Sequence, residues 1–512
     1  MDYSNKSFVK ICDNTDLNSI KKIKFDGKIL FVGFGGVAKC VLHYLDYYIT
    51  CDYSKIHIVD KCDESIYGPD IKKLKKSNMI NNFRVTSYNF ENLLNKFGMG
   101  KGDLVIDLSW HSSTYFFVSY CLSNGIHYIN TSIEDDADNF KGTSIDLQQK
   151  MVNKIFNECK QNGKIKSNVL IEFGQNPGLY QHYVLYALNQ MNKLNKKQKN
   201  VKDDFSKETL TKVIDDYQIG TIFCSEIDNM VKYKEPVLKE NKIYNTWSVY
   251  GFLNESFDNA ELSVGLKNNY VKPFIPEKYI DITRMKFLTK TEKQGYDVLF
   301  LKSIGIKSTF NSICPVIRND DKIEFKNYRG KIIHHGETFE MANYFGEKSP
   351  MLSYVYKMNK YARKSIKTIF EKNPTYNGTD LQIKVESQCN NFEIFDNIGK
   401  KKEDSIIGHD TVGCTIYCGK DEVDRIFWCG SILSQDDENV HSDFTATIVQ
   451  VAAAVLTGIS YVLENKPSGV LFPSDLDTNY VFDKSAPLLG KLFFTEIPKD
   501  EFDGKFKFCA SI

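Results

Sequence analysis

The hydrophobic pattern of the first third of the chain predicts buried strands that alternate with amphipathic helices. Residues 29–32 form an apolar run that ends at a glycine, and from Val37 onward apolar residues return at helical spacing. Apolar runs that suddenly become polar recur at 103–110, 125–132 and 168–178. Strands that alternate with helices predict βαβ units with right-handed crossovers, and therefore a parallel sheet.

Two more strands are expected between the first helix and residue 103, at 55–60 and 83–88. After residue 178 the rhythm changes to short runs rich in Val, Ile, Tyr and Phe, interrupted by Gly, Asn and Pro, which predicts strands joined by turns. The candidates are 221–225, 298–301, 331–334 and 411–417. The predicted fold class is α/β, with an N-terminal Rossmann-type parallel sheet plus an α+β domain built on a largely antiparallel sheet.

Composition narrows the classes of partner. The 512 residues are 42% hydrophobic and 26% charged with a formal net charge of +1, so no strong field recruits nucleic acid or an anionic membrane. The lysine-rich stretch 195–202 has no interleaved aromatic residues, and the apolar segment 449–463 is too short to span a bilayer, so it is predicted to be a buried helix. We expect neither a nucleic-acid nor a membrane partner.

The chain contains thirteen cysteines without a C-x-x-C pair or a His-flanked cluster. This pattern favours reduced thiols in a cytoplasmic protein, and it argues against a disulfide framework or a metal site. The N-terminus lacks the apolar core of a signal peptide.

The turn after the first strand is the most specific motif. It reads Gly33-Phe34-Gly35-Gly36-Val37-Ala38, the G-x-G-x-x-A form of the dinucleotide fingerprint, between a strand and a helix. Glycines allow the tight turn and the close approach of a pyrophosphate, which the amides at the helix N-terminus then face. The alternative is an ordinary βα turn.

Asp60 ends the second predicted strand, where an acid accepts hydrogen bonds from the adenosine ribose and repels the extra phosphate of NADP. Asp60 therefore favours NAD, although Lys61 beside it weakens this inference. The alternative is a plain strand-end residue.

Other polar residues follow the later strands of the parallel sheet, at the edge where ligands gather. We expect them near the cofactor, although such residues are also common in turns and helix caps. They are Asp107, Ser109, Thr131, Ser132 and Asn176.

In the second region, Trp247 lies in a polar, turn-prone stretch, and His335 and Glu337 follow a β-like run. In extended backbone, residues two apart share a face, so these two side chains are predicted to enter one cavity. Glu226 and Asp228 repeat this spacing. The alternatives are that the tryptophan is a core residue and that the acids are solvated.

The motifs together resemble the bacterial-type homospermidine synthases, which belong to the saccharopine dehydrogenase-like oxidoreductases. The likeness is patchy but spans nearly the whole chain. The matching stretches are 29–40, 107–110, 128–132, 174–179, 245–252, 335–337, 408–410, 430–431, 450–458 and 464–470.

The resemblance implies a redox-neutral use of NAD on the polyamines putrescine and spermidine, in a homodimer. Hydride leaves an amine-bearing carbon, a second putrescine attacks the resulting imine, and the hydride returns to give homospermidine. It implies that Trp247 holds a cationic amine, that Asn176 orients substrate or nicotinamide, and that His335 and Asp410 move protons. Anchors for the ammonium groups would be Glu226, Glu255 and Glu337.

On this basis we expect an NAD-binding domain over 1–178 and a substrate and dimerisation domain over 179–440. Residues 441–512 would form a helical segment that packs back on the first domain.

Two other functions remain open. A dehydrogenase of saccharopine or carboxynorspermidine would need cationic clamps for carboxylates, and arginine is scarce, with none in these motifs. A non-catalytic NAD-binding sensor would keep the fold but would have no need of the second set of residues.

Overall fold

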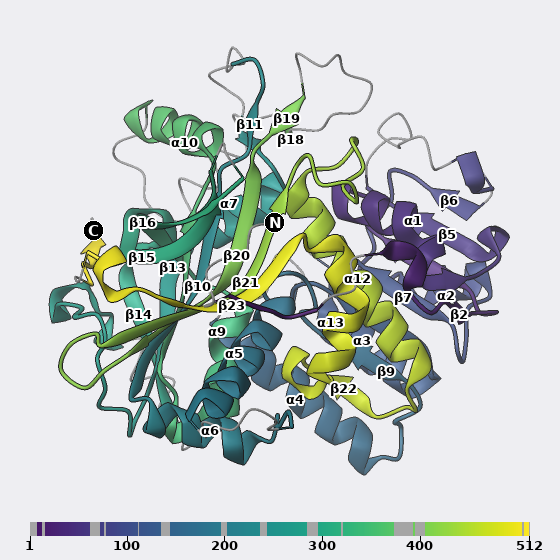
Figure 1. Ribbon diagram of the computed structural model, residues 1–512. Coiled ribbons are helices and arrows are strands. Elements are labelled where there is room, and N and C mark those ends of the chain that lie inside the picture. The colour runs from purple at the N-terminus through teal and green to yellow at the C-terminus, as the bar shows by residue number, and fades with distance from the viewer. Residues whose placement is uncertain are drawn as a thin grey trace. The chain divides into compact units, whose positions relative to one another are not determined.

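The computed structural model describes most of the chain (Figure 1). The described residues are 8–12, 16–61, 72–75, 78–110, 112–134, 144–195, 202–235, 243–283, 295–318, 321–372, 393–394, 405–503 and 506–510.

The chain forms two compact units and passes between them four times. Unit 1 contains residues 1–13, 180–447 and 489–512, and unit 2 contains residues 14–179 and 448–488. Each unit is therefore assembled from segments that are far apart in the sequence.

Unit 2 contains a seven-stranded sheet in which all neighbouring strands are parallel. Its order is β22 (Gly469–Leu471), β9 (Asn168–Leu170), β8 (His127–Asn130), β7 (Leu104–Asp107), β3 (Ile29–Val32), β5 (Ile56–Val59) and β6 (Met79–Ile80). A small parallel pair joins β2 (Ile23–Lys24) to β4 (Ile49–Thr50). The parallel sheet predicted for the N-terminal part is confirmed.

The strand predicted at 83–88 is wrong. The strand beside β5 is β6, and Asp60 fixes the chain after it, because its amide donates to Ile80 and its carbonyl accepts from Phe83. The side chain of Asn89 then accepts from the amide of Thr86 at 2.9 Å and donates to the carbonyl of Arg84. This local turn competes with strand pairing and leads into the next helix.

The two faces of this sheet are covered by different helices. Alternate strand residues, Leu30 and Val105 among them, share one buried cluster with apolar residues of α2 (Phe90–Phe97), α3 (Thr114–Asn124) and α4 (Ile145–Gln161). On the other face, α12 (Ala446–Glu464) passes so close that a Cβ on Gly458 would lie 2.4 Å from Ile129. The remaining helices of unit 2 are α1 (Gly36–Tyr48) and α13 (Thr478–Ser485).

Helix α12 is long and apolar enough to cross a membrane by composition, with a mean hydropathy of 1.8. Of that window, 83% is buried inside the structure, as in a core helix of a globular protein. The apolar stretch near residue 450 thus forms a buried helix.

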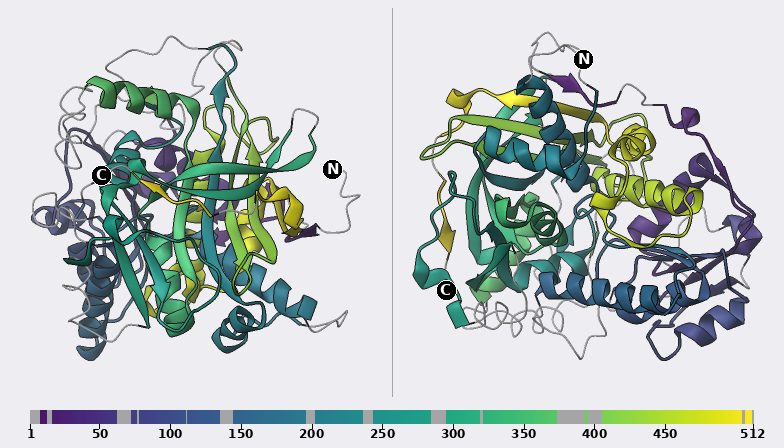
Figure 2. Two further views of the ribbon diagram at one scale, coloured as in Figure 1. Left: turned by 90° about the vertical axis from the view of Figure 1, so that its left-hand side faces the viewer. Right: turned by 90° about the horizontal axis from the view of Figure 1, so that it is seen from below.

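Unit 1 is built on an eleven-stranded, strongly twisted sheet (Figures 1 and 2). Its main path is β1 (Val9–Lys10), β23 (Lys491–Ile497), β21 (Arg425–Ser434), β20 (His409–Cys418), β10 (Ile219–Asp228), β17 (Met351–Lys357), β16 (Ile323–Ile333), β15 (Ser308–Ile317) and β24 (Cys509–Ala510). Strand β13 (Asn259–Gly265) pairs with β17 and with β14 (Tyr296–Ile304). Only the β10–β17 pair within this sheet is parallel among the described residues, so the predicted antiparallel character is confirmed.

Helices and short strand pairs complete unit 1. The helices whose bounds lie within its described residues are α5 (Leu179–Asn195), α6 (Lys207–Asp216), α7 (Val249–Phe257), α9 (Gly336–Phe345) and α10 (Lys360–Lys372). The short pairs are β11 (Val231–Lys232) with β19 (Ile406–Ile407), and β12 (Tyr244–Asn245) with β18 (Glu393–Ile394).

Candidate active site

The glycine turn of unit 2 lies between β3 and α1, where the sequence places it. Gly33 has a φ of +82°, and a Cβ there would lie 2.7 Å from Cα of Ser109, so both the backbone conformation and the space require glycine. The amide of Gly33 donates to the carbonyl of Val59 at 2.8 Å. This turn brings the chain directly across the carboxyl ends of the neighbouring strands.

Gly35 and Gly36 serve different purposes. A Cβ on Gly36 would meet the side chain of Ile448 at 2.9 Å, so this glycine lets α1 pack closely against α12. A Cβ on Gly35 would meet nothing within 4 Å, and Gly35 has a φ of −77°, so the fold does not itself require glycine there. Gly35 is the N-cap of α1 and makes no side-chain cap. An open space before the first amides of α1, including that of Val37, fits a dinucleotide pyrophosphate.

Asp60 lies beside this turn. Its carboxylate accepts a hydrogen bond from the backbone amide of Phe34, and the residue is 9% exposed. The acid therefore helps to hold the glycine turn, a role that sequence reasoning did not assign to it.

Asp107, at the end of β7, is a buried carboxylate surrounded by protein donors. It accepts from the hydroxyls of Ser109 at 2.7 Å, Ser112 at 2.9 Å and Tyr128 at 2.8 Å, and from the amide of Ser109. Burial raises the pKa of Asp107, and these hydrogen bonds oppose the rise. Asp107 and Ser109 thus bind each other and fix the edge of the sheet.

The polar residues after β8 are also linked. The hydroxyl of Ser132 donates to Glu134 at 2.9 Å, and the backbone of Glu134 exchanges hydrogen bonds with Thr114. Glu134 is 8% exposed and was missed, although its spacing of two from Ser132 after a strand end was a usable signal. It joins the candidate residues of unit 2.

Asn176 lies in a tight turn that follows β9. The backbone of Gly174 pairs with Gly178, donating to the carbonyl of Pro177 at 2.7 Å, and a Cβ on Gly174 would lie 3.5 Å from Thr131. The turn therefore places Asn176 beside the carboxyl ends of β8 and β9.

The second set of candidate residues lies in unit 1, on one face of its sheet. Glu226 on β10 is opposite Tyr356 on β17, and Asp228 is opposite Asp410 on β20. Since residues directly opposite share a face, β10 and its two neighbours present acidic and aromatic side chains together.

His335 lies between two carboxylates. Its Nδ1 is 2.7 Å from Oε2 of Glu337, and its Nε2 is 3.4 Å from Oε1 of Glu255 on α7. Burial alone lowers the pKa of His335, but the charges and hydrogen bonds of Glu337 and Glu255 outweigh it and raise that pKa well above its usual value. The two carboxylates therefore favour the protonated, imidazolium form of His335.

His335 and Glu337 contact each other, but the extended backbone predicted for both residues is wrong. Strand β16 ends at Ile333, His335 is the N-cap of α9, and Glu337 lies in the first helical turn. An acid in the first turn of a helix is favoured by the helix dipole, and here the Glu337 carboxylate also hydrogen-bonds the side chain of the N-cap residue, His335.

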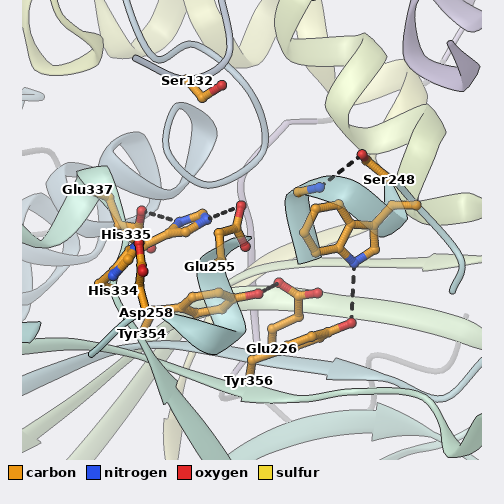
Figure 3. A network of polar contacts seen from close by, with 12 residues as sticks. Ser132, Glu226, Ser248, Glu255, Asp258, His334, His335, Glu337, Tyr354 and Tyr356 are labelled. Atoms are coloured by element: carbon orange, nitrogen blue, oxygen red, sulfur yellow. Dashed lines mark hydrogen bonds and ion pairs between the residues drawn. The ribbon is translucent and has the colours of Figure 1, made fainter. Parts of the chain in front are cut away.

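Two tyrosines of β17 connect this group to the tryptophan (Figure 3). The Tyr354 ring lies 4.7 Å from the His335 ring and its hydroxyl donates to Glu226 at 2.7 Å. Tyr356 stacks on Tyr354 at 5.7 Å, and Nε1 of Trp247 donates to its hydroxyl at 3.3 Å. The network runs without interruption from Glu255 to the indole.

Asp410 lies on the neighbouring strand. Its Oδ2 accepts from the hydroxyl of Thr447 at 2.6 Å, while Oδ1, also buried, has no well-formed hydrogen bond within the described part of the chain. Burial, together with the charges of Glu226 and Asp228, raises the pKa of Asp410 well above its usual range.

Five of the residues predicted for the site lie in one network of unit 1: Glu226, Trp247, Glu255, His335 and Glu337. Asp410 lies on the strand next to this network, whereas Asn176 belongs to unit 2. Sequence reasoning missed Tyr354 and Tyr356, which alternate on a strand that otherwise reads as core. The network contains one imidazolium against three carboxylates, so it suits a cationic ligand. Within the described residues, no group of three His, Cys, Asp or Glu side chains is arranged to hold a metal.

Known proteins resemble this chain both in sequence and in structure. Residues 29–169 match a family model described as the saccharopine dehydrogenase NADP binding domain. The chain is 24% identical over 509 residues to a homospermidine synthase of Mesorhizobium japonicum, covering 94% of this chain and 93% of the relative. It is also 24% identical over 501 residues to one of Blastochloris viridis, covering 91% and 90%.

Among solved structures, a homospermidine synthase of Legionella pneumophila in complex with NAD superposes with a TM-score of 0.73. It is 20% identical and covers 93% of each chain. This likeness confirms the predicted fold, and the family model places a domain described as NADP-binding within unit 2. The resemblance to bacterial-type homospermidine synthases, within the saccharopine dehydrogenase-like proteins, is confirmed over more than nine-tenths of the chain.

Proposed function

We propose that this protein is a homospermidine synthase that uses NAD within each catalytic cycle. The observation that carries the proposal is the buried network of unit 1, in which an indole, two tyrosines, a protonated histidine and three glutamates are gathered on one sheet face. A site of acids and aromatic rings suits a diamine better than a carboxylated substrate.

In the proposed reaction, putrescine, or the aminobutyl end of spermidine, loses a hydride from its amine-bearing carbon and a proton from nitrogen to give an imine. A second putrescine adds to the imine carbon, and ammonia or diaminopropane departs. The hydride then returns to the new imine, giving homospermidine. Bound NAD supplies the hydride acceptor and, once reduced, the donor, so no net oxidation occurs.

The chain's own residues supply binding and orientation. Trp247 is half-buried, and its ring can hold an ammonium or iminium by a cation–π contact worth up to about 2 kcal/mol when desolvated. Glu226, Glu255 and Glu337 anchor ammonium groups, and the tyrosine hydroxyl on Glu226 fixes the direction of that carboxylate. Asn176 orients the substrate or the nicotinamide.

Proton transfer falls to His335 and Asp410. Glu337 and Glu255 favour the imidazolium form of His335, which gives a proton to the departing amine, and the neutral imidazole left behind accepts the proton that a substrate amine loses on oxidation. Burial and the neighbouring charges of Glu226 and Asp228 favour the protonated form of Asp410, and its Oδ1 has no well-formed hydrogen bond among the described residues.

We further propose NAD over NADP, because the Asp60 carboxylate beside the glycine turn would repel a ribose phosphate. By the same resemblance we expect a cytoplasmic homodimer.

The test is incubation with putrescine and a catalytic amount of NAD. Homospermidine and ammonia in equal amounts, without accumulating NADH, support the proposal. Steady net NADH formation would indicate a plain dehydrogenase instead, and the absence of any product would indicate a sensor.

A further inference from the structure

We propose that Asp228 is a positioning residue, which fixes the Trp247 indole without touching the substrate. The inference rests on the proposed function only in so far as Trp247 is taken to contact the amine. Nothing in the sequence distinguishes Asp228 from Glu226, since both point to the same face of β10.

The contacts of Asp228 are all with the protein. Its Oδ2 accepts from the hydroxyl of Thr246 at 2.5 Å and from the amide of Asn359 at 3.1 Å, and its Oδ1 accepts from the amide of Met230 at 3.0 Å. Asp228 is 3% exposed. Both oxygens are therefore used within the fold.

These contacts hold the chain immediately before the tryptophan. Thr246 precedes Trp247, and its carbonyl also accepts from the hydroxyl of Thr445 at 2.7 Å. Asn359 donates a second hydrogen bond to the side chain of Asn245 at 3.1 Å. Asn245 and Thr246 are thus tied by side chains that come from three different parts of unit 1.

The orientation of Asn359 is itself determined. Its Oδ1 accepts from the amides of Tyr361 at 3.0 Å and Ala362 at 2.9 Å at the start of α10, so its amide nitrogen must face Asp228. The first turn of α10 therefore supports the carboxylate.

Beyond this anchor the indole has few constraints. Nε1 reaches Tyr356, the ring meets Phe252 edge-on at 6.2 Å, and a Cβ on Gly251 would lie 2.9 Å from the ring. Trp247 remains half-buried, so one part of the ring is left for a ligand. Its position depends on the main chain that Asp228 holds.

Asp410, directly opposite on β20, shows the contrast. It uses one oxygen on Thr447 and keeps the other without a well-formed partner in the described chain. Of this pair of carboxylates, Asp410 retains the capacity to meet a ligand, whereas Asp228 does not.

The test compares Asp228→Asn with Thr415→Val. Asparagine keeps the shape of the side chain but points its amide NH2, a donor, at one or more of the three donors that Asp228 accepts from, which loosens residues 245–247. Thr415 lies on the opposite sheet face, where its hydroxyl donates to Ser225 and to the carbonyl of Ile313, both at 2.9 Å. Thr415→Val therefore removes buried hydrogen bonds from the same pair of strands, β10 and β20, on the face away from Trp247, and it serves as the stability control.

Three measurements are made on each protein: melting temperature, kcat and KM for putrescine with NAD, and acrylamide quenching of Trp247. The Trp247 signal is the difference between each variant and the same variant with Trp247→Phe. We expect Asp228→Asn to lower kcat/KM about 10- to 100-fold and to increase quenching, as for a displaced binding group. Thr415→Val should lower the melting temperature but change kcat/KM less than about twofold.

Equal losses of kcat/KM in the two variants, or unchanged quenching in Asp228→Asn, would overturn the proposal. If Asp228→Asn does not fold, Thr246→Val, which deletes only the donor to Asp228, gives the same test. If the parent turns over no diamine, the proposed function fails, but the quenching comparison still decides whether Asp228 positions Trp247.

Discussion

The two candidate binding regions differ in which part of the chain would meet the ligand. In unit 2 the turn at Gly33–Gly36 offers main-chain amides and empty space, and its side chains contribute almost nothing. In unit 1 the network consists of side chains from β10, β17, α7, α9 and the stretch before α7. A contiguous peptide forms the first region, whereas chain segments more than 100 residues apart form the second.

This difference predicts different responses to substitution. A main-chain site is broken by adding atoms, because the amides themselves remain in place. A side-chain site is broken by removing atoms, and the effect depends on which neighbours then lose a partner. The following experiments test this contrast, from the largest expected effect to the smallest.

Gly35→Val should weaken NAD binding by up to about 150-fold while leaving the melting temperature nearly unchanged. A Cβ at position 35 would meet no protein atom within 4 Å, and valine would fill the space before α1; overpacking by such a group is worth about 1–3 kcal/mol, or about 5- to 150-fold in affinity. Titration of the protein with NAD, followed by calorimetry, gives the affinity.

Gly33→Ala is the matched control. Its φ of +82° and the 2.7 Å approach to Ser109 predict a loss of about 1–3 kcal/mol in the free energy of unfolding. A stable Gly33→Ala protein, or Gly35→Val with normal affinity, would contradict the assignment of the turn.

Trp247→Ala should lower kcat/KM for putrescine about 30-fold, the equivalent of a desolvated cation–π contact of about 2 kcal/mol. The affinity for NAD should stay the same, because the residue lies in unit 1. Steady-state kinetics and NAD titration are measured on the same preparation. If the variant loses affinity for NAD as well as turnover, the assignment of Trp247 to substrate binding alone would be wrong.

Asp60→Ala should weaken NAD binding about tenfold, since it removes a charged acceptor worth about 1.5 kcal/mol from the amide of Phe34 and from the ribose. It should also narrow the preference for NAD over NADP. Parallel titrations with the two cofactors measure both effects. Tighter binding of NADP than of NAD by the parent protein would refute the choice of cofactor.

Glu255→Gln should give the smallest effect, a lower pKa of His335, because one of its two carboxylates is lost. A raised folded-state pKa contributes stability that is complete below the unfolded pKa of about 6.5 and disappears as pH rises through the folded value. The variant should therefore lose most unfolding free energy, relative to the parent, near pH 6 and progressively less at alkaline pH.

NMR titration of the imidazole and urea unfolding at several pH values measure these changes. Asp258→Asn is the control, because its carboxylate lies 3.9 Å from Nε2 of the neighbouring His334, whereas the carboxylates paired with His335 belong to Glu255 and Glu337. A titration of His335 that moves equally in both variants would disprove the specific pairing.

The same contrast decides what the sequence could reveal. The glycine turn, its strand and its helix are local, so residues 29–48 were predictable in type and position. Trp247, Glu226 and His335 were found through a resemblance, because composition alone left each near its ordinary structural role. Tyr354 and Tyr356 escaped notice, since their importance comes from β17 pairing with β10, and that pairing joins residues about 130 positions apart.

Two local errors have physical causes as well. The stretch at 83–88 contains strand-forming residues, but the Asn89 side chain bonds the amide of Thr86 and the carbonyl of Arg84, which a strand would use for pairing. The contact between His335 and Glu337 was expected from a strand and is made by a helix start, because i and i+2 also meet when the first residue is an N-cap in extended backbone.

The chain passes back and forth between its two units, and this order has a consequence for folding during synthesis. Strand β1, near residue 10, pairs with β23, and β9 pairs with β22, so each sheet is joined by a strand that is made about 300 to 480 residues after its partner. Neither half can be obtained by a single cut, and an isolated cofactor unit would need residues 448–488 grafted after residue 179. Removal of residues 469–497, which contain β22 and β23, would leave both sheets unfinished at once.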